Sequence, residues 1–124
     1  MSRLAPEKIL WVRKGEGIAA QGKVPADAPF FLDHFPAFPV LPGVLSLEIL
    51  KTAAQIYFKE TGEPAHGSVR KVEAAKFASY LKPGDSWEAQ LKLVSSEPGS
   101  SKWEGKLVSQ NRTAASVRLY LDAK

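Results

Sequence analysis

The architecture depends on residues 42–62, which read PGVLSLEILKTAAQIYFKETG. Pro42 stands at the entry of this stretch and Gly62 stands just past its end, the asymmetry expected of helix termini. We therefore predict one helix from Gly43 to about Glu60, roughly 26 Å long at a rise of 1.5 Å per residue. Apolar residues cover most of its circumference, so the pattern favours a central helix over an ordinary amphipathic surface helix.

Strand-like runs lie on both sides of this helix. Before it, residues 9–12 and 18–24 are separated by the turn 14–17, a pattern typical of a hairpin. After it, turn signals separate four further runs, which predict an antiparallel meander of strands at 68–79, 87–95, 102–109 and 113–121. Alternating apolar and polar residues give the second and fourth of these runs one buried and one wetter face. The predicted fold class is α+β, within a single domain of residues 1–124.

The segment that precedes the helix is irregular but apolar. Prolines at positions 29, 36, 39 and 42 exclude both a long helix and a central strand there. Because the same segment is rich in phenylalanine, we expect it to pack against the rest of the domain.

Composition narrows the function classes. The chain has 124 residues, 44% of them hydrophobic and 24% charged, which fits one globular domain and excludes disorder for most of the chain. The chain has no cysteine, so it has no disulfide and no thiolate nucleophile. It also has no apolar leader and no apolar run long enough to span a membrane, so we expect a cytoplasmic protein. The net charge of +4 favours acidic partners.

Several common chemical motifs are absent. Gly15 and Gly17 lack the third glycine of a dinucleotide fingerprint, and the sequence contains no Walker-type loop and no H-E-x-x-H. Ser46 lacks the flanking glycines of a hydrolase nucleophile elbow. His34 and His66 have no metal-ligand spacing, so we expect no metal and no cofactor.

One histidine and one carboxylate remain as candidates for acid–base chemistry. His34 lies in the proline-rich segment and Glu48 lies 14 residues later in the predicted helix. Glu48 also has a purely structural explanation, because it belongs to a polar stripe at helical spacing and can pair with Lys51. That stripe consists of Glu48, Lys51, Thr52, Gln55 and Lys59.

The stretch that holds both candidates resembles a known family. Residues 34–48 read HFPAFPVLPGVLSLE, with Phe30-Phe31 ahead of them, and are similar to the signature of the 3-hydroxyacyl-(acyl carrier protein) dehydratases of bacterial fatty acid synthesis. Matching elements follow in order at Lys76-Phe77, Pro83-Gly84-Asp85, Trp103 and Gly105, so the resemblance covers roughly residues 9–122. It implies a hot-dog fold, in which a long central helix is wrapped by a curved antiparallel β-sheet, and a homodimer.

The resemblance also implies residue roles. His34 falls on the catalytic histidine, Glu48 on the catalytic acid, and Gly43 on the residue whose backbone N–H receives the thioester carbonyl. A glutamate rather than an aspartate at position 48 resembles the dehydratase-only branch rather than the dehydratase-isomerase branch. In the family the two catalytic side chains come from different subunits. Residues expected to line the acyl tunnel are Phe35, Phe38, Pro42, Val44 and Phe77.

The basic residues between positions 66 and 82 have two interpretations. They are either a solvated strand edge or a docking patch for an acidic acyl carrier protein. These residues are Arg70, Lys71, Lys76 and Lys82. The basic residues lack the interleaved aromatic residues of a nucleic-acid site, so nucleic acid is a distant alternative.

The implied function is dehydration of a 3-hydroxyacyl thioester, held on acyl carrier protein or coenzyme A, to the trans-2-enoyl thioester. Three positions depart from the family pattern, with Asp33 in place of glycine, Thr52 in place of glutamine and Ala78 in place of arginine. Two alternatives stay open, the first of them because of Asp33 and Thr52. One is a catalytically silent hot-dog subunit that binds acyl chains or supports a partner, and the other is a hot-dog thioesterase.

Overall fold

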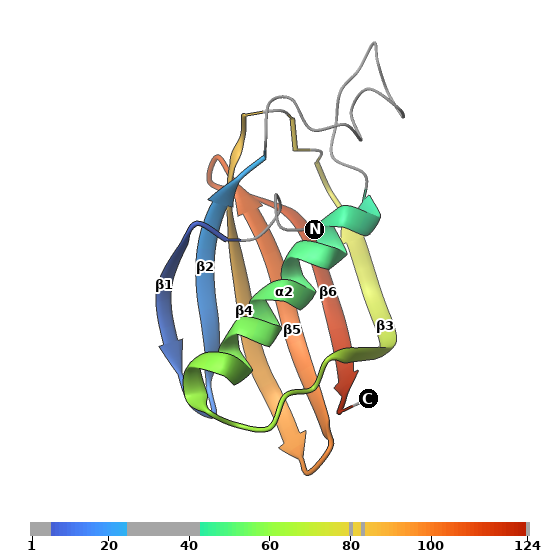
Figure 1. Cartoon of the computed structure of the whole chain (residues 1–124). Helices are drawn as coiled ribbons and strands as arrows, with labels where there is room; N and C mark the ends of the chain where they lie inside the picture. The colour runs from blue at the N-terminus through green and yellow to red at the C-terminus, as the bar shows by residue number, and fades with distance from the viewer. Residues whose placement is uncertain (1–5, 25–42, 80, 83, 124) are drawn as a thin grey trace.

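The computed structural model describes residues 6–24, 43–79, 81–82 and 84–123. The predicted elements are all present, and their boundaries agree with the sequence-based ones to within two residues. In chain order they are β1 (Lys8–Arg13), β2 (Gly17–Lys23), α2 (Gly43–Thr61), β3 (Ser68–Phe77), β4 (Ser86–Glu97), β5 (Ser100–Ser109) and β6 (Arg112–Asp122) (Figure 1).

The six strands form one antiparallel sheet in the order β1-β2-β4-β5-β6-β3. The predicted hairpin of β1 and β2 is confirmed, and β4, β5 and β6 form a meander. The prediction that β3 opens this meander is wrong, because β3 pairs with β6 at the far edge. Strand β4 lies beside β2 instead. Backbone hydrogen bonds join the end of β2 to the start of β4: Val24 N–H donates to Asp85 O, and Gly84 N–H donates to Val24 O, both at 2.8 Å.

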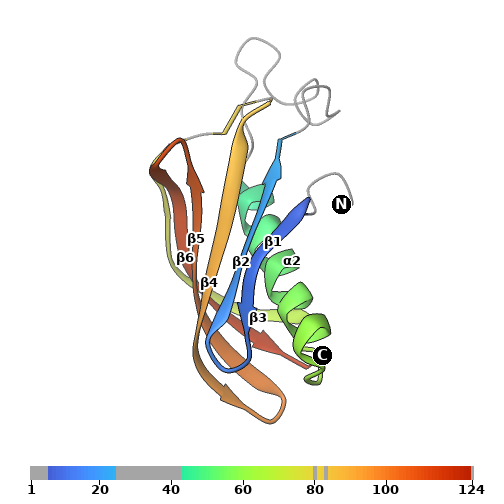
Figure 2. The ribbon, with the colours of Figure 1, turned by 90° about the vertical axis from the view of Figure 1, so that its left-hand side faces the viewer.

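Helix α2 covers one face of the sheet and leaves the other face uncovered (Figure 2). Its buried side chains meet the inward-pointing residues of β2, β4, β5 and β6, and these residues together form the core. The polar stripe runs along the opposite side of the helix, so in the single chain the sheet encloses α2 from one side only. No helix within the described ranges is long and apolar enough to cross a membrane.

A glycine of the sheet lies beneath a side chain of the helix. A Cβ atom added to Gly105 on β5 would lie 2.8 Å from Leu91 Cδ2 and 3.4 Å from Leu50 Cδ1. Leu50 belongs to α2 and Leu91 to β4, and both are almost fully buried. Gly105 therefore provides the space into which the helix side chain packs.

We expect Gly105→Ala to lower the free energy of unfolding by about 1–3 kcal/mol, because the added methyl overpacks a closed core. Gly67→Ala is the matched control, since its added Cβ would meet only Gln55 Nε2, at 3.9 Å. Urea denaturation of both variants and the parent measures the difference. Equal midpoints for the two variants would contradict the tight packing at position 105.

Strand β3 is irregular and exposed. Its register with β6 shifts twice, between Val69 and Lys71 and between Glu73 and Lys76, and each shift inserts one extra residue into β3. At the second bulge Ala74 adopts a φ of 53°, a left-handed conformation that is costly for a non-glycine residue. The bulge places Lys76 on the helix-free face of the sheet and Phe77 on the helix side, where it pairs with the buried Ala115.

Candidate active site at the start of the helix

Gly43 and Glu48 both lie in the N-terminal part of α2. Gly43 is the first residue of the helix, as predicted. Its N–H is one of the four that a helix leaves without an internal acceptor, at the positive end of the helix dipole. Such a donor suits a carbonyl oxygen that gains negative charge during a reaction.

Glu48 lies on the side of α2 that faces away from the sheet. Lys51 Nζ lies 3.8 Å from Glu48 Oε1, and the two side chains are 29% and 37% exposed respectively. The pairing expected from the polar stripe is thus present. A partly exposed pair of this kind contributes at most about 1 kcal/mol, so it is readily exchanged for other contacts. Glu48 does not lie between the helix and its own sheet.

The other half of the predicted site falls in a different part of the chain. His34, Phe35, Phe38 and Pro42 lie outside the described residues, and so does Asp33. Val44 belongs to the first turn of α2. The catalytic pairing of His34 with Glu48 therefore stays a prediction.

The described tunnel candidate, Phe77, lies on an apolar strip. Val69, Val72 and Phe77 pair with buried residues of β6 on the helix side of the sheet, yet are 41%, 39% and 44% exposed. They lie on β3, which is an edge strand of the sheet. A continuous row of exposed apolar side chains on an edge strand is typical of an interface.

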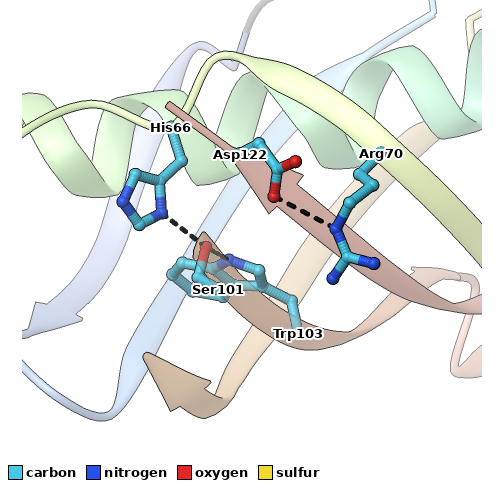
Figure 3. Close-up of polar contacts among 5 residues, drawn as sticks. All are labelled: His66, Arg70, Ser101, Trp103 and Asp122. Carbon is cyan, nitrogen blue, oxygen red and sulfur yellow. Dashed lines mark hydrogen bonds and ion pairs between the residues drawn. The ribbon is translucent and has the colours of Figure 1, made fainter. Parts of the chain in front are cut away.

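The four predicted docking residues separate into two groups. Arg70 and Lys71 lie near the start of β3, where Arg70 Nε is 3.1 Å from Asp122 Oδ1 and Lys71 Nζ is 3.0 Å from Glu73 Oε2 (the first pair is drawn in Figure 3). Lys76 lies five residues further along the same strand, and Lys82 lies in the turn that leads to β4. At about 3.3 Å per residue, Lys71 and Lys76 are roughly 15 Å apart, so the four do not form one cluster.

The carboxylate of Glu73 is tied into the first of these groups. Tyr120 donates a 2.6 Å hydrogen bond to Glu73 Oε1. This bond, followed by the hydrogen bond from Lys71, lowers the pKa of Glu73 below its ordinary value. Glu73 is therefore ionised at neutral pH and balances one neighbouring cation.

A buried polar cluster that the sequence did not reveal lies under the C-terminal half of α2. His66 Nδ1 is 2.8 Å from Ser101 Oγ, which accepts a 2.9 Å hydrogen bond from Trp103 Nε1 (Figure 3). The ring of Phe58 packs on His66 at a centroid distance of 4.7 Å. His66 and Ser101 are 5% and 3% exposed, so the pair has no access for a substrate and acts as a cross-link between the 62–67 connection and β5.

Tyr57 extends this buried cluster toward the first hairpin. Its hydroxyl accepts a 2.8 Å hydrogen bond from Gly15 N–H and donates a 2.6 Å hydrogen bond to Glu63 Oε1. Burial, and then the hydrogen bond to Glu63, raises the pKa of Tyr57 above its ordinary value, so the phenol stays neutral. Within the described part of the chain, no group of three or more His, Cys, Asp or Glu side chains could hold a metal ion.

Comparison with known proteins identifies the class. The dehydratase heterocomplex ApeI:P from Xenorhabdus doucetiae superimposes with a TM-score of 0.77 at 17% identity, covering 98% of this chain and 88% of that one. A hypothetical thioesterase with coenzyme A from Streptococcus pneumoniae has a TM-score of 0.70 at 11% identity, with 95% and 90% coverage. These likenesses, together with a single helix on a six-stranded antiparallel sheet, define a hot-dog fold, as the sequence resemblance implied.

The family follows from sequence. Residues 11–118 match the model of the ApeI-like family, described as ApeI dehydratase, and the chain belongs to this family. A 3-hydroxyacyl-[acyl-carrier-protein] dehydratase FabZ from Ruminiclostridium cellulolyticum is 32% identical over 114 residues, which is 90% of this chain and 80% of the relative. The resemblance predicted from residues 34–48 is thereby confirmed, and the chain is a dehydratase-type lyase.

Proposed function

We propose that the protein removes water from a 3-hydroxyacyl thioester and releases the trans-2-enoyl thioester. The observation that carries this proposal is the position of Gly43 and Glu48 on one helix end, in a chain that belongs to a dehydratase family. The thioesterase alternative receives less support, since only fold-level neighbours point to it.

The proposed reaction needs a base, an acid and an oxyanion donor. His34 takes the proton from C2, Glu48 protonates the hydroxyl that leaves C3 as water, and the C2–C3 double bond forms from the C–H electron pair. The N–H of Gly43 stabilises the negative charge that develops on the thioester oxygen. The protons balance, because one is taken from C2 and one is given to the leaving hydroxyl. His34 ends protonated and Glu48 ionised, and a proton transfer between them restores the site.

The active form is proposed to be a homodimer. The exposed apolar strip of Val69, Val72 and Phe77 supports an interface along β3. Such an interface would cover the helix side of the sheet next to Phe77, where the acyl chain is expected. It would also allow His34 of one subunit to meet Glu48 of the other, in line with the family resemblance.

The acyl group is proposed to arrive on an acidic acyl carrier protein. The FabZ relative acts on carrier-bound substrate by its name, and the net charge of +4 suits an acidic partner. A cytoplasmic location stays a prediction.

The test is a pair of assays on one purified sample. With a short 3-hydroxyacyl thioester, we expect ultraviolet absorbance of the enoyl thioester to rise while free thiol stays at background. Thiol release without enoyl absorbance would replace the dehydratase by a thioesterase. Absence of both products, with acyl thioester binding retained, would indicate a catalytically silent subunit that needs an active partner.

A further inference from the structure

The helix-free face of the sheet is organised in rows that run across the strands. Residues that pair directly in an antiparallel ladder point to the same face. Three of the rows that β3, β6, β5 and β4 form on this face contain its cations. The first is Lys71–Tyr120–Lys102, the second Glu73–Arg118–Glu104–Lys92, and the third Lys76–Ser116–Lys106–Gln90.

The rows differ in charge. In the second row anions and cations alternate, so it is neutral. The first and third rows contain cations and no carboxylate. Two further rows of this face lie outside these three, Ser68–Asp122–Ser100–Glu97 beside the first and Thr113–Val108–Glu88 beside the third, and on these strands they contain three carboxylates and no cation. The five rows together hold six cations and five carboxylates, a formal charge of +1, so the positive charge of the face is concentrated on the first and third rows.

A hollow lies on this face beside the third row. It has a volume of about 370 Å³, and its walls include Lys76, Lys106, Arg118 and Glu104, with Ser116 between them. Ala74, at the second bulge of β3, also lines it. The bulge thus both bends the strand here and turns Lys76 toward the hollow. Three cations against one carboxylate make the hollow attractive to an acidic group.

We propose that this face, centred on the hollow between Lys76 and Lys106, is the docking surface for the acidic carrier protein. The inference rests on the proposed function and adds to it the residues that receive the carrier. Of the four docking residues expected from sequence, it keeps Lys71 and Lys76 on the face and adds Lys102 and Lys106. Arg70 is the extra residue of the first bulge of β3 and is not part of the rows, and Lys82 belongs to the turn before β4.

Charge selects the occupant. A second copy of this chain would bring another hollow with three cations and one carboxylate against the first, which like-charge repulsion disfavours. An acidic protein instead gains attraction from both cationic rows. Such attraction accelerates association and is screened by salt over about 8–10 Å.

The surface also lies at the correct end of the molecule. Lys76 is the last outward-pointing residue of β3, and the next residue, Phe77, points to the helix side. The end of β3 and the first turn of α2 lie at the same end of the molecule (Figure 1). A carrier held at Lys76 could pass its flexible arm around this end of the sheet toward Gly43.

The test is direct binding of a purified bacterial acyl carrier protein to the full-length protein, by isothermal titration calorimetry. We expect the double variant Lys76→Glu/Lys106→Glu to have a dissociation constant about five- to thirtyfold higher at 50 mM NaCl. This is the range that a loss of one or two kcal/mol of binding free energy produces. At 500 mM NaCl the difference between variant and parent should nearly vanish.

The matched control is Lys14→Glu/Lys59→Glu, which changes the net charge by the same amount at exposed residues away from the rows. It should keep an affinity within about twofold of the parent. If carrier binding weakens equally in both variants, the effect comes from net charge alone and the docking surface is overturned. Parental affinity of the Lys76/Lys106 variant, with an unchanged melting temperature, would overturn it as well. Binding is measured without turnover, so the two proposals can fail separately. If the protein dehydrates small thioesters but binds no carrier protein, the docking surface is overturned and the proposed dehydratase function stands.

Discussion

Glu48→Gln is expected to reduce kcat for dehydration by about 10²- to 10⁴-fold, the contribution of a positioned general acid. The amide keeps the size of the side chain but has no acidic proton to give to the leaving hydroxyl. Loss of the ion pair with Lys51 should cost at most about 1 kcal/mol, so the fold should persist. The measurement is the initial rate of enoyl thioester formation at saturating substrate.

Glu60→Gln is the matched control, because Glu60 is an exposed glutamate on the same helix, three turns further on. Its kcat should stay within about twofold of the parent. His34→Ala should lose as much as Glu48→Gln, and the double variant should be little slower than either, because acid and base act in the same transition state. If Glu48→Gln keeps near-parental turnover, Glu48 is not the general acid, and its only role is the ion pair with Lys51.

Val72→Glu is expected to separate the proposed homodimer and to abolish activity with it. Val72 is 39% exposed on the helix side of an edge strand, so in the dimer its side chain would lie in the interface. An unpaired charge buried there costs about 3–5 kcal/mol, which raises the dissociation constant at least about a hundredfold. Sedimentation velocity at micromolar concentration measures the change, together with the dehydration rate.

Val94→Glu serves as the control for this experiment. Val94 is a similarly exposed apolar residue, at 44%, but lies on β4 away from the β3 edge. We expect this variant to remain dimeric and active. A Val72→Glu protein that keeps the parental sedimentation coefficient and rate would place the interface elsewhere, and a parent that is an active monomer would remove the dimer from the proposal.

The elements with strong local signals could be predicted from sequence. Pro42 and Gly62 fixed the ends of the helix to within one residue, and the alternating pattern of β4 and β6 fixed which side of each strand is buried. The order of the strands was harder to predict, because pairing between β3 and β6 joins residues that are 38 to 54 positions apart in the sequence. Nothing in the local sequence of β3 specifies that partner.

The candidate site was predictable in part for the same reason. Residues 34–48 carry a specific pattern, so the roles of His34, Gly43 and Glu48 followed from the resemblance. Lys102 and Lys106 could not be predicted as docking residues from sequence, because only the register of β5, β6 and β3 brings them into rows with Lys71 and Lys76. The cluster of His66 with Ser101 also depends on tertiary contact, and a lone histidine gives no sequence signal for it.

The bulge at Ala74 sets two residues of β3 opposite one residue of β6. Glu73 pairs with Arg118 and Lys76 pairs with Ser116, so Ala74 and Ala75 together stand opposite Val117. Deleting one of these two alanines would leave a single residue opposite Val117, and Lys76 and Phe77 would keep their present faces. A deletion elsewhere between the two bulges would instead shift Val72 or Glu73 out of register with β6. The bulge is therefore the position at which β3 can lose a residue without turning Lys76 or Phe77 to the other face.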